Sequence, residues 1–108
     1  MDTTFDSTEM QESARQASKL LKALSNESRL LILCNLTEGE KSVSELIPLV
    51  DLSQSALSQH LARLRQEGLV KTRRSSQSIY YSLQGEKARQ VIELLYRLYC
   101  ADGDDSPT

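Results

Sequence analysis

The 108-residue sequence has few of the residues on which several protein classes depend. It has no tryptophan, one phenylalanine, one histidine and two cysteines. Two cysteines and a single histidine do not make a convincing tetrahedral metal site, so neither a metal nor another cofactor is expected. The sequence also lacks a CxxC motif, a glycine-rich phosphate loop and a nucleophile with a nearby base, so it gives no support for an enzyme.

Long apolar runs are absent as well. No run approaches the roughly 18 residues that a membrane span needs. The N-terminus, MDTTFDSTEMQE, lacks the basic flank and the apolar core of a signal peptide. We therefore expect a cytoplasmic protein of one domain with no membrane partner.

The net charge of -2 is unevenly distributed along the chain. Residues 1–12 carry four acidic and no basic residues, and residues 90–108 carry four acidic residues and one basic residue. Between them, residues 53–89 carry seven basic and two acidic residues, a local charge of +5. A local positive field attracts phosphates whatever the net charge, which favours a nucleic-acid binder. A solvated charged surface would have a similar composition.

The first half of the chain has the pattern of three helices. Apolar residues at helical spacing predict a helix over about 9–24 and a second over about 27–36. Ser42 and Glu45 form a capping box that begins a third helix. Pro48 is expected to keep this helix short, because proline is tolerated without distortion only in a first turn.

The second half has one more helix, a hairpin and a last helix. The fourth helix runs over 53–67, capped by Ser53 and stopped by Gly68. The period then changes from helical to alternating, which predicts two strands. The expected segments after the fourth helix are strands 69–74 and 78–83, a loop 75–77 and a helix over about 85–100.

This order predicts a mainly α fold with a β-hairpin, a winged helix-turn-helix of order ααααββα. Residues 1–8 are expected to form a flexible tail and residues 101–108 an acidic C-terminal tail. The domain between them, residues 9–100, would serve DNA binding and dimerisation.

The third and fourth helices have the character of a helix-turn-helix, whose second helix enters the major groove by its N-terminal turns. Leu57, Leu61 and Leu64 would face the core. The polar residues left outside can donate and accept hydrogen bonds to base edges, and glutamine can bond an adenine in two places. They are Gln54, Ser55, Ser58 and Gln59. Taken alone, these residues could equally be solvated helix positions.

The hairpin makes the DNA-binding interpretation stronger. A two-stranded ribbon directly after a recognition helix is the wing that touches phosphate or the minor groove. Such contacts fix register and supply much of the affinity. The wing residues expected to contact DNA are Arg73, Arg74 and Gln77.

Together these segments resemble the ArsR/SmtB family of bacterial repressors over about residues 12–100. The resemblance implies a homodimer built from the first and last helices, which binds inverted-repeat operator DNA with its recognition helices about 34 Å apart. The residues that carry it are LLKALSNESRLLIL (20–33), VSEL (43–46), LSQSALSQHLARLRQEGLV (52–70) and RRSSQSIYYSL (73–83).

The metal-sensing members of that family need ligand clusters that this sequence lacks. The third-helix region, SVSELIPLVDLS, has no cysteine or histidine, and the last helix lacks the Asp/His pairs used for zinc. His60 lies in the middle of the recognition helix, where a packing or capping role is more common than ligation.

The two cysteines match the dithiol subgroup of the family, the SqrR/BigR/HlyU-like regulators, at Cys34 in ILC and Cys100 in RLYC. In that subgroup the matching cysteines respond to persulfides, polysulfides or related oxidants and become joined by a disulfide or a bridge of several sulfurs. The resemblance therefore implies a repressor that leaves its operator when Cys34 and Cys100 react with reactive sulfur species. Genes of sulfide and reactive sulfur detoxification would be its targets.

Three other interpretations remain open at this point. The chain could be an ArsR-family regulator, including an activator that displaces silencing proteins, with another inducer and structural cysteines. Cys34 on the apolar side of a helix is consistent with a small core residue. A thiol redox enzyme and a protein-interaction module on the same scaffold are the alternatives from other classes.

Overall fold

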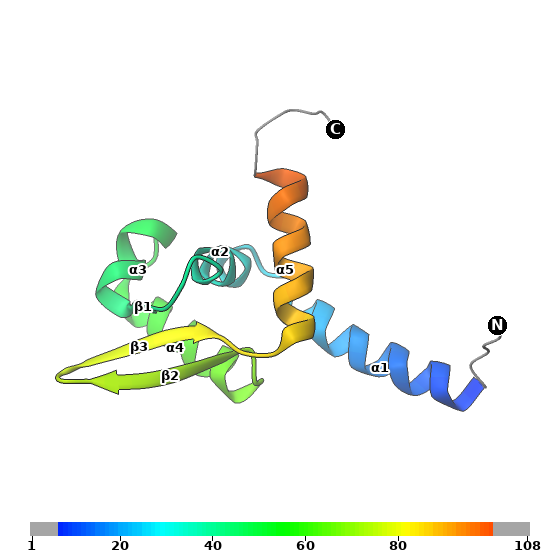
Figure 1. The fold of residues 1–108 in the computed structure, drawn as a ribbon. Helices are drawn as coiled ribbons and strands as arrows, with labels where there is room; N and C mark the ends of the chain where they lie inside the picture. Colours follow the sequence, from blue (N-terminus) through cyan, green and yellow to red (C-terminus); the bar gives the residue numbers. More distant parts are fainter. Residues whose placement is uncertain (1–6, 101–108) are drawn as a thin grey trace.

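The computed structural model describes residues 7–100, which form five helices and a three-stranded antiparallel sheet of order β1-β3-β2 (Figure 1). The elements, in chain order, are α1 (Ser7–Leu24), α2 (Glu27–Leu36), β1 (Lys41–Ser42), α3 (Val43–Val50), α4 (Gln54–Gln66), β2 (Val70–Ser75), β3 (Ser78–Leu83) and α5 (Glu86–Tyr99).

The predicted winged helix-turn-helix is confirmed, and local capping bonds explain where its helices begin. The Ala56 N–H donates to Ser53 Oγ at 3.1 Å at the start of α4. At the start of α3, the Glu45 N–H donates to Ser42 Oγ at 3.2 Å and the Ser42 N–H donates to Glu45 Oε1 at 2.9 Å. Each bond satisfies an amide that the helix itself leaves without a partner.

The recognition helix ends where the sequence predicts. Gly68 has φ +78, a left-handed conformation that side chains disfavour. This turn lets the Gly68 N–H reach the Arg65 carbonyl at 3.0 Å and the Leu69 N–H reach the Leu64 carbonyl at 2.9 Å. The two bonds make a Schellman motif, and they turn the chain directly into the hairpin.

A single apolar core joins the helices to the base of the hairpin. Helix α2 lies at its centre, packed against α1, α3, α5 and β3. The predicted inward stripe of α4 is confirmed, since its three leucines are fully buried. The side chains with no more than 1% exposure are Ile32, Leu33, Leu36, Leu46, Leu57, Leu61, Leu64, Val70 and Ile92.

The ends of the chain differ slightly from expectation. Helix α1 begins at Ser7, two residues before the expected start of the first helix, so Ser7 and Thr8 of the expected tail are helical. The rest of that tail and the acidic segment 101–108 lie outside the described residues.

Three local features were not predicted. A third strand, β1, pairs with β3, with Lys41 opposite Tyr81 and Ser42 opposite Tyr80. The loop of the hairpin is two residues long, because Ser75 pairs with Ser78. Helix α3 is short as expected but continues two residues past Pro48. Proline has no N–H to bond the carbonyl of Ser44, four residues earlier, and both residues are exposed.

Much of the first helix makes no contact with the core. Residues 7–19 of α1 are exposed, and the helix projects away from the body of the molecule (Figure 1). Helix α5 rises from the same corner and exposes large apolar side chains near its end, Leu94, Leu98 and Tyr99. Within residues 7–100, no helix has both the length and the apolar character required to cross a membrane.

The capping box gives a testable prediction for stability. We expect Ser42→Ala to lower the free energy of unfolding by about 1 kcal/mol, because the Glu45 amide loses its acceptor. Ser44→Ala, at an exposed position in the first turn of the same helix, is the matched control and should change it by only a few tenths. Urea unfolding of both variants at one protein concentration measures the difference; equal effects would contradict the capping role.

Candidate DNA interface and cysteine pocket

The N-terminal turns of α4 present a polar surface. Gln54, Ser55, Ser58 and Gln59 are all exposed, whereas Leu57 between them is fully buried. We name these four polar residues the recognition face. The buried leucine stripe fixes the rotation of the helix, so the four side chains point outward together.

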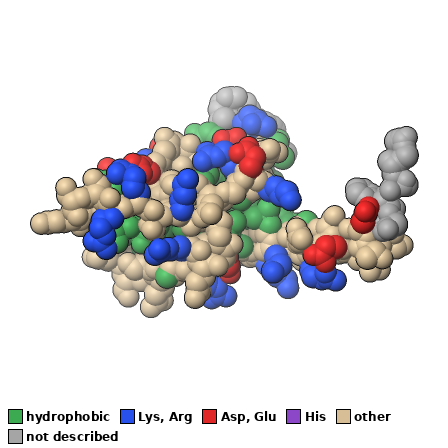
Figure 2. Space-filling view, turned by 60° about the horizontal axis from the view of Figure 1, so that its bottom comes forward, with side chains coloured by type: hydrophobic (Ala, Val, Ile, Leu, Met, Phe, Trp, Pro, Cys, Tyr) green, Lys and Arg blue, Asp and Glu red, His purple; other side chains and the backbone are tan. Residues whose placement is uncertain are grey.

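The β2–β3 hairpin follows α4 after the tight turn at Gly68. Lys71, Arg74 and Gln77 are exposed on it, with Gln77 in the two-residue turn. Figure 2 shows lysine and arginine side chains spread over the part of the molecule that includes the hairpin. The predicted wing therefore carries positive charge beside the recognition face, an arrangement suited to a phosphate backbone.

Arg73 is exposed like its neighbour Arg74, but it has partners within the protein. Its Nη2 donates to Glu40 Oε2 at 2.6 Å and its Nε donates to Glu40 Oε1 at 3.1 Å. The guanidinium carbon also lies 5.0 Å from the centre of the Tyr80 ring. The hydrogen bond from Arg73 lowers the pKa of the Glu40 carboxyl, and the same bond raises the pKa of Arg73.

Sequence reasoning did not find Glu40. It lies immediately before β1, the strand that was not predicted, and it is distant in sequence from the hairpin. Only the pairing of β1 with β3 brings it beside Arg73.

The two cysteines, both free, line one cavity between α2 and α5. Cys34 is half-buried on α2, and Cys100 is exposed at the C-terminal end of α5. The cavity has a volume of about 710 Å³, and its lining is mostly apolar, with two carboxylates. Its lining residues are Glu27, Leu30, Leu31, Cys34, Asn35, Glu38, Tyr96, Tyr99 and Cys100, which we name the cysteine pocket.

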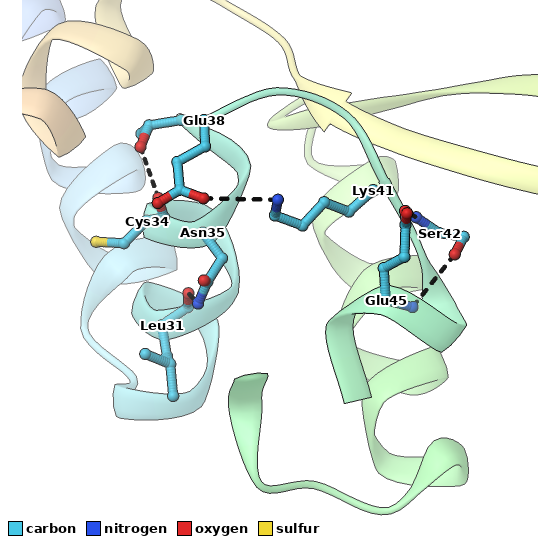
Figure 3. A network of polar contacts seen from close by, with 8 residues as sticks. Leu31, Cys34, Asn35, Glu38, Lys41, Ser42 and Glu45 are labelled. Atoms are coloured by element: carbon cyan, nitrogen blue, oxygen red, sulfur yellow. Dashed lines mark hydrogen bonds and ion pairs between the residues drawn. The ribbon is translucent and has the colours of Figure 1, made fainter. Parts of the chain in front are cut away.

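The two thiols differ in their surroundings. Burial raises the pKa of the Cys34 thiol, and the proximity of Cys100 raises it further. In Figure 3 the Cys34 sulfur points away from the polar contacts drawn there, which include the Glu38–Lys41 ion pair at 3.6 Å. The Cys34 carbonyl accepts a hydrogen bond from the Thr37 hydroxyl at 2.6 Å, so its backbone is fixed at the end of α2.

The described part of the chain offers no group of three or more His, Cys, Asp or Glu arranged to hold a metal ion. His60 is half-buried on α4, between the recognition face and the buried stripe.

Comparison with known proteins agrees with this geometry. Residues 26–72 match the family model described as bacterial regulatory protein, arsR family. The chain is 53% identical to the transcriptional activator HlyU of Vibrio cholerae over 92 residues, which are 85% of each protein. It is 43% identical to the biofilm growth-associated repressor of Xylella fastidiosa over 93 residues, 86% of this chain and 82% of that protein.

The solved structures agree as well. The structure of reduced HlyU from Vibrio cholerae superposes with a TM-score of 0.82 at 53% identity, covering 85% of this chain and 97% of that one. Identity and coverage of this size establish the family along with the fold. The chain belongs to the arsR family of bacterial regulatory proteins, and it is a winged helix-turn-helix transcriptional regulator.

Proposed function

We propose that this regulator binds operator DNA as a homodimer and is released when reactive sulfur species join Cys34 to Cys100. The observation that carries the proposal is that two free cysteines, one on α2 and one at the end of α5, line the same cavity. The chain acts in this proposal as a regulator and not as an enzyme, since each thiol pair reacts once until it is reduced.

The exposed recognition face and the adjacent charged hairpin support the assignment of DNA contacts. In the proposed complex, Gln54, Ser55, Ser58 and Gln59 enter the major groove and bond to base edges. Arg74 and Gln77 of the hairpin contact the phosphate backbone beside it. Arg73, which was expected to do the same, is bonded to Glu40.

The exposed apolar side chains of α1 and α5 support a dimer. Met10 and Leu21 on α1 are 55% and 58% exposed, and Leu98 and Tyr99 on α5 are 64% and 82% exposed. Such side chains are expected to be buried against a second copy. Two-fold symmetry would then present two recognition faces to an inverted-repeat operator.

The sulfur chemistry balances with a persulfide, RSSH, as the oxidant. The Cys100 thiolate attacks the outer sulfur and displaces RS⁻, which leaves Cys100 as a persulfide. The Cys34 thiolate then attacks the Cys100 sulfur and displaces HS⁻, so that two thiols and RSSH give one disulfide, RSH and H₂S. Cys100 is the residue that attacks first in this scheme because it is exposed, while burial raises the pKa of the Cys34 thiol and so lowers its thiolate fraction.

A bridge would couple α5, part of the proposed dimer interface, to α2, which packs against α3 of the helix-turn-helix. Moving one helix in a closely packed core shifts its neighbours. A tenfold loss of DNA affinity requires only about 1.4 kcal/mol of bias against the DNA-competent arrangement. The two relatives described above are named as an activator and a repressor. We propose a repressor of sulfide and reactive sulfur detoxification genes; displacement of a silencing protein by the same DNA contacts would make it an activator.

A second candidate is a regulator with another inducer and structural cysteines. The half-burial of Cys34 beside the core favours it, because a small thiol packs well there. The cysteine variants below distinguish the two candidates.

Base recognition predicts a loss of specific affinity alone. The operator is first identified by selection from random duplexes. We expect Gln59→Ala to lower the affinity for this operator by about tenfold and to leave the affinity for unrelated DNA unchanged. Gln66→Ala, an exposed glutamine at the other end of α4, is the matched control and should bind like the wild type. Fluorescence anisotropy measures both; equal loss on operator and unrelated DNA would contradict base readout by Gln59.

Thiol sensing predicts that both cysteines are required for release. Glutathione persulfide should lower operator affinity of the wild type by about tenfold or more, with a Cys34–Cys100 bridge seen by intact mass spectrometry. Cys34→Ser and Cys100→Ser should bind the operator normally when reduced and stay bound after treatment. Normal release of Cys34→Ser would refute sensing by the pair and leave the structural role.

The dimer predicts a change of molar mass. We expect Leu98→Glu to weaken self-association by more than about tenfold, because two carboxylates would be buried near the symmetry axis. Leu49→Glu, at a similarly exposed leucine on α3, should leave the dimer intact. Light scattering over a dilution series tests both; an unchanged dimer in Leu98→Glu would exclude this part of α5 from the interface.

A further inference from the structure

The contacts of Arg73 differ from those expected of an arginine whose side chain is available to a DNA phosphate. Both of its hydrogen bonds go to one carboxylate, through Nε at 3.1 Å and Nη2 at 2.6 Å, in the two-point geometry of an Arg–carboxylate pair. The guanidinium also covers the Tyr80 ring at 5.0 Å. The charge of Arg73 is thus compensated within the protein.

The order of the strands shows which parts of the molecule this ion pair connects. Glu40 lies just before β1, Arg73 lies on β2, and β3 with Tyr80 lies between the two. The ion pair therefore reaches across the central strand and joins the two edges of the sheet. Since β1 leads directly into the Ser42 cap of α3, the pair connects the wing to the first helix of the helix-turn-helix.

We infer that Glu40 is a positioning residue for operator binding: with Arg73 it forms a strut that fixes the wing relative to α3, and Arg73 is not a phosphate ligand. The inference rests on the proposed operator binding and departs from the expectation that Arg73 and Arg74 contact DNA alike. Arg74 is the next residue on β2 and pairs with Ile79 of β3. Because successive side chains of a strand alternate, the Arg74 side chain lies on the other face of the sheet from that of Arg73.

Two other roles of this ion pair are less consistent with the expected energies: stabilising the fold, and holding Arg73 ready for a phosphate. Exposed ion pairs contribute little to stability, so stabilising the fold does not account for this one. A phosphate that took Arg73 would have to displace a two-point carboxylate and leave Glu40 facing the DNA backbone. What remains is geometry: the pair, stacked on Tyr80, holds two edge strands in one arrangement.

Exchanging the two charges separates a strut from a phosphate contact. Arg73→Glu alone should lower operator affinity by about tenfold, because two carboxylates then face each other across β3. Adding Glu40→Arg restores the pair with reversed direction, and affinity should return to within about threefold of the wild type. A phosphate ligand could not tolerate glutamate at position 73. Arg74→Glu is the matched control, and Glu40→Arg should not rescue it.

Salt dependence gives an independent readout. The slope of log affinity against log salt should be unchanged in the exchanged pair. It should fall by about 1.8 in Arg74→Gln, about 0.9 for each of the two protomers on the operator. Glu40→Gln and Arg73→Gln should weaken binding alike, with no further loss in the double variant. These neutral variants keep the test valid if the charge exchange disturbs folding, which circular dichroism would reveal.

The inference is overturned if the exchanged pair binds no better than Arg73→Glu, if its salt slope falls by one phosphate contact per protomer, or if Glu40→Gln binds DNA more tightly. Tighter binding would mean that Glu40 competes with DNA for Arg73. Failure of the wild type to bind selected DNA would instead refute the proposed function.

Discussion

The rest of the structure depends on the packing of helix α2, which contacts α1, α3, α5 and β3 at once. Ile32, Leu33 and Leu36 of this helix are fully buried. Because a core of this density has little free volume, α2 cannot shift without moving the elements around it. Cys34 lies on the same helix, half-buried, in the lining of the cysteine pocket. Chemistry at that sulfur therefore acts on the helix that connects the DNA-reading half of the molecule to α5.

The helices and the buried face of α4 were predictable because their signals are local. Capping side chains lie within three residues of the amides they bind, as at Ser42 and Ser53. The leucines at 57, 61 and 64 recur at helical spacing, which orients the helix without knowledge of its neighbours. Strand β1 was missed because two residues show no periodicity, and its pairing partner lies far along the chain. The two residues of α3 past Pro48 were missed for a related reason, because only the structure shows that this position is exposed to water.

The functional surfaces also differ in whether local sequence signals could predict them. The recognition face could be predicted from one helix, because exposure follows from the rotation of the leucine stripe. That Cys34 and Cys100 line one cavity could not be deduced from spacing, since it depends on how α2 and α5 pack; only the resemblance to a family suggested it. The partner of Arg73 had no sequence signal, and two adjacent arginines that look equivalent in sequence occupy different environments.

Hydrogen exchange of the reduced and the bridged chain, compared by mass spectrometry, tests most directly whether α2 transmits the state of the cysteines to the DNA-reading helices. The account predicts altered protection in α2, α3 and α4 of the bridged chain, extending well beyond the residues that flank the two sulfurs. Changes confined to the end of α5 and the adjacent turn of α2, in a bridged chain that has lost operator affinity, would contradict it.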